Sequence, residues 1–158
     1  MEDSSPNDID IAVIFQKIPL KDQLNHAQEI KKQLQKESNV PIHIKSFDLY
    51  SLFDEANFAK EGILFYGKSL VYKDYFVNRF GLNPRIQISY FLEKLEKKDK
   101  IRFHYMLRGK KGEYGLLKKY GGELLKPGLI EVYPEYENVF VTSIKKTLSD
   151  FKLKKILC

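Results

Sequence analysis

The chain begins with a polar turn that runs directly into an apolar strand, and this junction constrains the fold more than any other feature. Residues 4–7 read Ser-Ser-Pro-Asn, and residues 11–15 read Ile-Ala-Val-Ile-Phe. Successive side chains of a strand point to opposite faces, so we expect Asp8 and Asp10 to share one face. The N-terminal part is therefore predicted to contain a sheet with two carboxylates aimed at one point.

Paired carboxylates at the start of a strand suit a hard divalent cation. Mg²⁺, or Mn²⁺ in its place, takes one or two carboxylates from a protein and completes its shell with water and substrate phosphates. A solvated acidic turn in front of a strand also explains Asp8 and Asp10, because an Asp-x-Asp motif often arises by chance. The motif alone leaves both interpretations open.

Three further elements are predicted after this strand. Apolar residues at helical spacing predict an amphipathic helix, and Pro41–Lys45 alternates as a strand. Residues Asp48–Lys60 read as a second helix, with Asp48 as its N-cap and Gly62 just past its end. The apolar positions of the first helix are Leu20, Leu24, Ala27, Ile30 and Leu34.

The segment Glu2–Phe15, followed by these elements in this order, resembles the metal-binding part of the nucleotidyltransferases related to DNA polymerase β, especially the minimal nucleotidyltransferases. Lys60–Lys68 is similar to the short closing segment of that family. The resemblance covers residues 1–74. It implies that Asp8 and Asp10 are the catalytic Mg²⁺ ligands. It also implies that the activity is transfer of a nucleoside monophosphate from an NTP to an acceptor, and a protein is one possible acceptor.

One departure from the family concerns its phosphate-binding element. The family places a Gly-Ser about ten residues before its Asp-x-Asp, at the start of a helix whose N-terminal amides bind phosphates. Only seven residues precede Asp8. We therefore expect an N-terminally truncated or degenerate domain over residues 1–74 that lacks this element. A start codon assigned too late, a truncated gene and a degenerate domain all remain open.

A second departure concerns the third carboxylate of the family. Pro41, His43 and Lys45 are predicted to share one face of their strand, and none of them is acidic. His43 aligns with the missing carboxylate. A neutral imidazole could bind a metal or take a proton, but it is a poor ligand for Mg²⁺. A strand histidine that is hydrogen-bonded to the backbone is the alternative.

Positive charge is concentrated in the second half of the chain. Residues 1–78 have a net charge of −3 and residues 79–158 a net charge of +9. Cations interleaved with aromatic rings favour RNA or DNA, because cations neutralise phosphates and rings stack on bases. A lysine-rich solvated surface is the alternative. The candidate nucleic-acid-binding residues are Arg102, Arg108, Lys110, Lys111, Lys118 and Lys119.

The second half is predicted to be a basic α+β domain, residues 75–158, of no family that we recognise. The glycine-bounded segment Gly109–Gly112 lacks the Gly-Lys-Ser/Thr ending of a P-loop, and an exposed turn explains it better. The expected elements are a strand through Ile86, Ile88 and Tyr90, a helix Lys97–Arg108, a short helix Leu116–Tyr120, a strand Leu129–Tyr133, a helix Glu135–Leu148, and a strand or short helix Phe151–Leu157.

The sequence as a whole predicts an α/β protein, in which a truncated mixed-sheet nucleotidyltransferase core precedes the small basic α+β domain. The single cysteine, Cys158, excludes an intramolecular disulfide, and no apolar run approaches the ~18 residues of a membrane span. We expect a cytoplasmic protein without a membrane partner. A non-catalytic nucleic-acid-binding or regulatory, antitoxin-like module is the alternative function.

Overall fold

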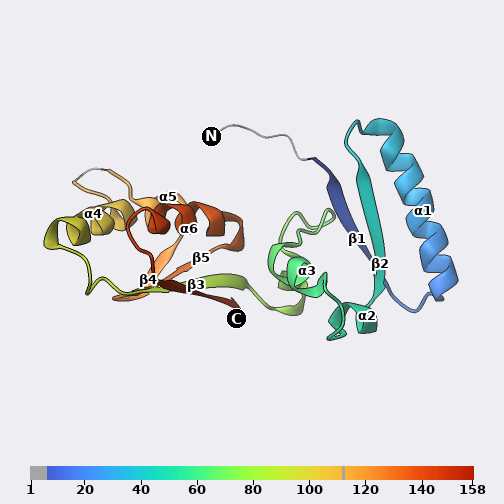
Figure 1. The fold of residues 1–158 in the computed structure, drawn as a ribbon. Helices are drawn as coiled ribbons and strands as arrows, with labels where there is room; N and C mark the ends of the chain where they lie inside the picture. The colour runs from blue at the N-terminus through green and yellow to red at the C-terminus, as the bar shows by residue number, and fades with distance from the viewer. Residues whose placement is uncertain (1–6, 112) are drawn as a thin grey trace. The chain divides into compact units, whose positions relative to one another are not determined.

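The computed structural model describes residues 7–111 and 113–158 as a mixed α/β structure (Figure 1). In this part of the chain there are six α-helices, a two-stranded parallel sheet and a four-stranded antiparallel sheet. The chain forms two compact units, of which the first ends at Lys60 and the second runs from Glu61 to Cys158. No helix in the described ranges is both long and apolar enough to cross a membrane.

The first unit consists of a parallel strand pair with a crossover helix. A parallel pair needs such a connection, because a tight hairpin reverses the chain direction. The predicted strand, helix and strand are confirmed, and the second strand continues three residues beyond Lys45. The elements are β1 (Ile9–Phe15), α1 (Leu20–Glu37), β2 (Ile42–Asp48) and α2 (Leu49–Phe53).

Helix α1 lies along one side of the β1–β2 pair (Figure 1). Ala27 of α1 and Ile42 of β2 are buried, whereas Leu20 and Leu24 are 66% and 49% exposed. Buried Gln23 is satisfied, because its Nε2 donates to the Ile18 carbonyl at 2.7 Å. The apolar stripe predicted for this helix therefore exists, but two strands cover only part of it.

The prediction of a helix over Asp48–Lys60 is wrong in its length, because α2 ends at Phe53. Asp48 is the N-cap as predicted, and it forms a capping box with Ser51. Asp54 and Asn57 then accept hydrogen bonds from nearby backbone amides, and the Asn57 side chain donates to the Ser51 and Leu52 carbonyls. Such side chains compete with helical hydrogen bonds, so α2 stops at Phe53.

Gly62 is likewise not a helix stop. It lies inside α3 (Lys60–Tyr66), which begins where the predicted helix was expected to end. The 3₁₀ helix η1 (Phe76–Phe80) follows, and an isolated bridge between Lys68 and Tyr75 joins the two flanks of the intervening turn.

The second unit is built on an antiparallel sheet with the strand order β4-β5-β3-β6. Together with α4 and α6, this order forms a split β-α-β arrangement of the ferredoxin-like kind. Its elements are β3 (Pro84–Tyr90), α4 (Lys97–Arg108), α5 (Leu116–Lys119), β4 (Glu123–Lys126), β5 (Leu129–Val132), η2 (Pro134–Tyr136), α6 (Glu137–Lys145) and β6 (Phe151–Leu157).

Most of the elements predicted for this half are confirmed. The helix expected over Glu135–Leu148 is shorter, because its first turn is the 3₁₀ helix η2 and its end is a turn in which Leu148 N donates to the Ile144 carbonyl at 2.9 Å. The segment Phe151–Leu157, for which the sequence predicted either a strand or a short helix, is a strand.

The core of the second unit lies between the sheet and helices α4, α5 and α6, which occupy one side of it (Figure 1). On β3, Ile86 and Ile88 are buried, whereas Arg85 and Gln87 alternate onto the opposite face. The buried cluster is Ile86, Ile88, Tyr90, Phe103, Leu107, Leu117, Ile130, Val132, Phe140, Ile144 and Leu148.

Candidate functional site

The predicted metal ligands lie at the start of β1. Asp8 directly precedes the strand and Asp10 is its second residue, and both side chains are exposed. The Ile9 amide donates to the Pro41 carbonyl at 2.9 Å and fixes the pairing beside Asp8. Strand side chains alternate, and this alternation, extended by the one residue that precedes β1, would turn Asp8 to the face of Asp10.

Strand pairing brings His43 next to this pair of carboxylates. In the parallel register, Asp10 is the Cα partner of His43, and Ala12 is the partner of Lys45. Register partners in a sheet point to the same face, so His43 and Lys45 share the face of the two aspartates. Both are exposed. The structure therefore places an imidazole and an ammonium group beside the predicted metal site.

The opposite face of these strands is apolar and is turned toward α1. Ile42 is buried and Ile44 is half-buried, and Ile44 lines a groove together with Leu24 and Ala27 of α1. The sheet of the first unit thus separates an apolar face under the helix from a polar face that carries the aspartates. This separation follows from alternation alone, so the sequence could predict it.

The donor set at this site fits a hard divalent cation with few protein ligands. Asp8 and Asp10 offer carboxylate oxygens, and Mg²⁺ commonly uses one or two carboxylates with water and phosphate for the rest. Over the described ranges, no group of three or more His, Cys, Asp or Glu side chains is placed to hold a metal. His43 is thus a neighbour of the pair, not a third ligand.

The predicted nucleic-acid-binding residues lie around the connection from α4 to α5. Arg102 and Arg108 belong to α4, Lys110 and Lys111 follow it, and all four side chains are exposed. On α5, Lys118 and Lys119 are exposed too.

Two exposed tyrosines accompany these cations. Lys110 Nζ lies 5.8 Å from the centroid of the Tyr105 ring, and Lys118 Nζ lies 4.3 Å from that of Tyr114. Phe103, in contrast, is 1% exposed and belongs to the core. The interleaved aromatics seen in the sequence therefore divide into surface rings and core rings.

The segment between α4 and α5 is closed at its base by two glycines. A Cβ atom on Gly109, where φ is +89°, would lie 2.1 Å from the Glu113 carbonyl oxygen. A Cβ on Gly115 would lie 2.3 Å from the Gly109 nitrogen. The sequence singled out Gly109–Gly112, of which Gly112 lies outside the described residues. Gly115, the partner that closes the segment, was missed.

A cavity of about 400 Å³ in the second unit was not predicted. It lies between the turn after α3 and the segments around β4 and β5, which are distant in sequence. No single motif spans these segments, so the cavity could not be predicted from local sequence patterns. Its walls are Lys68, Lys73, Asp74, Tyr75, Lys119, Tyr120, Gly121, Tyr133, Glu135 and Tyr136.

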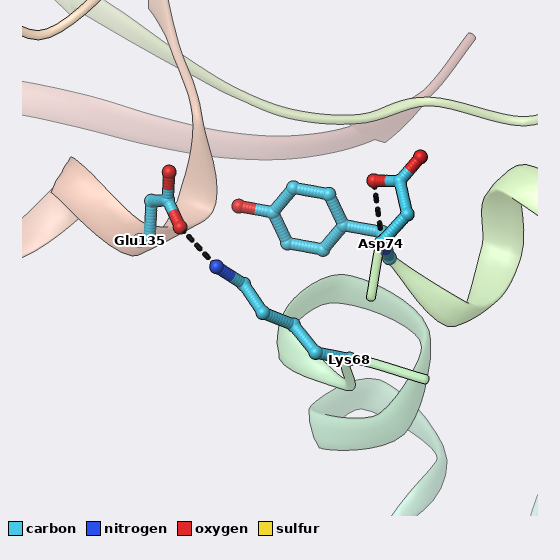
Figure 2. Close-up of polar contacts among 4 residues, drawn as sticks. Lys68, Asp74 and Glu135 are labelled. Atoms are coloured by element: carbon cyan, nitrogen blue, oxygen red, sulfur yellow. Dashed lines mark hydrogen bonds and ion pairs between the residues drawn. The ribbon is translucent and has the colours of Figure 1, made fainter. Parts of the chain in front are cut away.

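The two acidic groups of this cavity are already engaged, as Figure 2 shows for Lys68 with Glu135 and for Asp74. Asp74 accepts hydrogen bonds from the Tyr75 amide at 2.7 Å and from Asn78 Nδ2 at 2.6 Å. The hydrogen bond to the Glu135 carboxylate raises the pKa of Lys68. Burial raises the pKa of the Tyr75 phenol.

Comparison with known proteins gives no relative for this chain: no family model matches it, and no curated protein or solved structure is significantly similar to it.

Proposed function

We propose that the first unit is a metal-dependent nucleotide-binding domain of the nucleotidyltransferase type, which transfers a nucleoside monophosphate from an NTP to an acceptor. The observation that carries the proposal is the register of β1 and β2. It aligns Asp10 with His43 and Ala12 with Lys45. Alternation assigns His43 and Lys45 to the face of Asp10, opposite α1, and extends to Asp8 just before the strand. Carboxylates can bind the metal ion of a metal-bound triphosphate, an ammonium group can contact its phosphates, and an imidazole can accept a proton.

Each side chain has a distinct role in this proposal. Asp8 and Asp10 would hold a divalent metal ion, which would supply Lewis-acid chemistry and offset negative charge on the phosphates during in-line displacement. Lys45 adds a positive charge for a phosphate oxygen. The His43 imidazole accepts the proton of the attacking acceptor hydroxyl, whose oxygen bonds to the alpha phosphorus of the NTP while pyrophosphate leaves.

The rate expected from the described residues is low. Phosphoryl and nucleotidyl transfer depend on positioning and electrostatics, and each missing preorganised donor costs about 10²- to 10³-fold in rate. In the proposed arrangement, His43 stands where a third carboxylate would complete the metal site. We therefore expect metal binding to be the more robust property and turnover to be slow.

Calorimetric titration of Mn²⁺ tests the proposal directly. Asp8→Asn combined with Asp10→Asn should abolish the binding heat, because both carboxylates are lost while side-chain size is kept. Asp22→Asn, which neutralises an exposed acid in the first turn of α1, is the matched control and should bind as the wild type does. Equal heats for the wild type and the double variant would refute the site.

Transfer itself is measured with α-labelled NTPs and mixed RNA, DNA and protein acceptors. Slow, metal-dependent labelling that the double variant loses is the expected result. Labelling that persists in that variant would place the active site elsewhere.

A second candidate function, nucleic-acid binding by the second unit, is favoured by a specific observation. Six exposed cations surround the connection from α4 to α5, and two exposed tyrosines, Tyr105 and Tyr114, lie against lysines there. This surface would serve either an RNA or DNA acceptor or a non-catalytic, regulatory module.

A further inference from the structure

We infer that the cavity between the turn after α3 and the β5–η2 segment binds a nucleoside phosphate, either free or as the terminal nucleotide of a single strand. The inference goes beyond the proposed function, because all of its residues belong to the second unit and it requires neither Asp8 nor Asp10. The volume of the cavity, about 400 Å³, falls in the range of about 300–1,000 Å³ that is usual for small-molecule sites.

The charge left over in the cavity is positive. Glu135 is paired with Lys68, and Asp74 accepts two hydrogen bonds from neutral donors, so the three lysines and two carboxylates of the lining have a formal net charge of +1. Lys73 and Lys119 line the same cavity, and neither makes an ion pair with any carboxylate of the described residues. Two cations without an acidic partner are therefore available to an anion that enters the cavity.

The backbone holds Lys73 in an uncommon conformation. Its φ is +55°, a left-handed value that few residues other than glycine adopt. The turn is closed by hydrogen bonds of 2.8 Å from the Ser69 amide to the Asp74 carbonyl and from the Lys73 amide to the Ser69 carbonyl. Strained positions of this kind occur preferentially at binding sites. Here the strain fixes the start of a lysine side chain at the cavity wall.

The remaining walls are aromatic. Tyr120, Tyr133 and Tyr136 are half-buried, and the Tyr120 and Tyr136 ring centroids are 5.0 Å apart. The Arg85 guanidinium stacks on Tyr133 at 3.6 Å from its centroid. Gly121, with φ of +64°, sits against the same ring, because a Cβ there would lie 3.4 Å from Tyr133 Cε2. These rings are held in place by packing.

A nucleotide matches this combination of groups. Its phosphate would be neutralised by Lys73 and Lys119, and its base would rest on tyrosine rings, which stack with any base. Inorganic phosphate lacks the base and should bind more weakly. A free nucleotide and a strand end present the same chemistry, so the experiment must separate these two sources.

The test is a titration of the uniformly ¹⁵N-labelled full chain with AMP, with inorganic phosphate and with a 5′-phosphorylated hexamer of adenylates. The chemical shifts of the backbone amides report binding. AMP should shift the amides of Lys73, Lys119 and Gly121, and phosphate should bind at least about tenfold more weakly. Tighter binding of the hexamer than of AMP would identify a strand end as the ligand, and the reverse order a free nucleotide. No shift at these amides with either nucleotide probe would overturn the inference.

Variants separate the cavity from general attraction to a basic protein. Lys73→Asn combined with Lys119→Gln should weaken AMP binding at least about tenfold, since two charge-assisted contacts are lost. Asn is chosen at position 73 because it tolerates a positive φ. Lys146→Gln removes one charge from an exposed lysine outside the cavity and should leave binding unchanged. Equal affinity of the double variant and the wild type would refute the site, whatever the Mn²⁺ titration of the first unit gives.

Discussion

Asp10 and His43 are Cα partners in the parallel pairing of β1 with β2, and both side chains are exposed on the face opposite α1. In the nucleotidyltransferase arrangement proposed for the first unit, a third carboxylate would stand at the position of His43. The relationship between Asp10 and His43 therefore suggests a direct test of that proposal.

Replacement of His43 by aspartate should strengthen metal binding. His43→Asp sets a third carboxylate beside Asp10, and an added anionic ligand raises affinity for a hard cation by about tenfold or more. Mn²⁺ titration of His43→Asp, with His43→Asn as the neutral control, measures the change. If both variants bind Mn²⁺ equally, position 43 does not face the ion, and the proposed arrangement is wrong.

The two glycines Gly62 and Gly115 should respond in opposite ways to alanine. A Cβ on Gly62 meets nothing within 4 Å, and the residue is exposed inside α3, so Gly62→Ala should stabilise the second unit by about 0.5–1 kcal/mol. A Cβ on Gly115 would lie 2.3 Å from the Leu107 carbonyl oxygen, so Gly115→Ala should destabilise the unit by about 1–3 kcal/mol.

Urea unfolding, followed by far-ultraviolet circular dichroism, compares the two variants. Both positions belong to the second unit, so the same transition reports on each of them. A Gly115→Ala protein as stable as the wild type would show that the α4–α5 connection is not closed as described.

The first unit should lose helix capping in acid. Hydrogen bonds from Ser51 lower the pKa of Asp48 below its usual value of 3.8. A carboxyl whose pKa is depressed by folding stabilises the folded state above its unfolded pKa, and that contribution disappears as the pH falls through the folded pKa.

The chemical shift of the Ser51 amide, followed from pH 6 downward to about pH 2, should report this loss. Asp48→Asn keeps a good N-cap but cannot titrate, so its Ser51 amide should be insensitive to pH over the same range. Identical pH profiles for the wild type and Asp48→Asn would show that another group controls the cap.

Alternation and capping are the features that the sequence predicted well. The faces of β1, β2 and β3 follow from alternating residues, and Asp48 was recognised as an N-cap from its type and position. The break after α2 was missed, because it depends on where the Asn57 amide finds carbonyl partners. That choice is made by the folded chain and not by helical periodicity.

Contacts between segments that are distant in the chain could not be predicted from the sequence. The cavity joins Lys73 to Lys119, and nothing local in either segment indicates the other. The short strand β4 was also missed, since Glu123–Lys126 has neither clean alternation nor β-branched residues, and a register irregularity interrupts its pairing with β5.

Single-stranded RNA provides the test that distinguishes a nucleic-acid surface from a merely soluble one. Binding that depends on phosphate contacts should weaken as salt rises, with a log–log slope of about −0.7 per contact, because each neutralised phosphate releases a counterion. Charge reversal at Lys110 and Lys111 should therefore weaken binding and flatten the slope by about 1.4.

Lys145→Glu with Lys146→Glu reverses two adjacent exposed lysines at the end of α6 and should change the slope much less. Filter binding over a range of salt concentrations measures both variants. Equal slopes for the two would mean that net charge alone attracts the RNA, and the lysines after α4 would then have no special role in binding it.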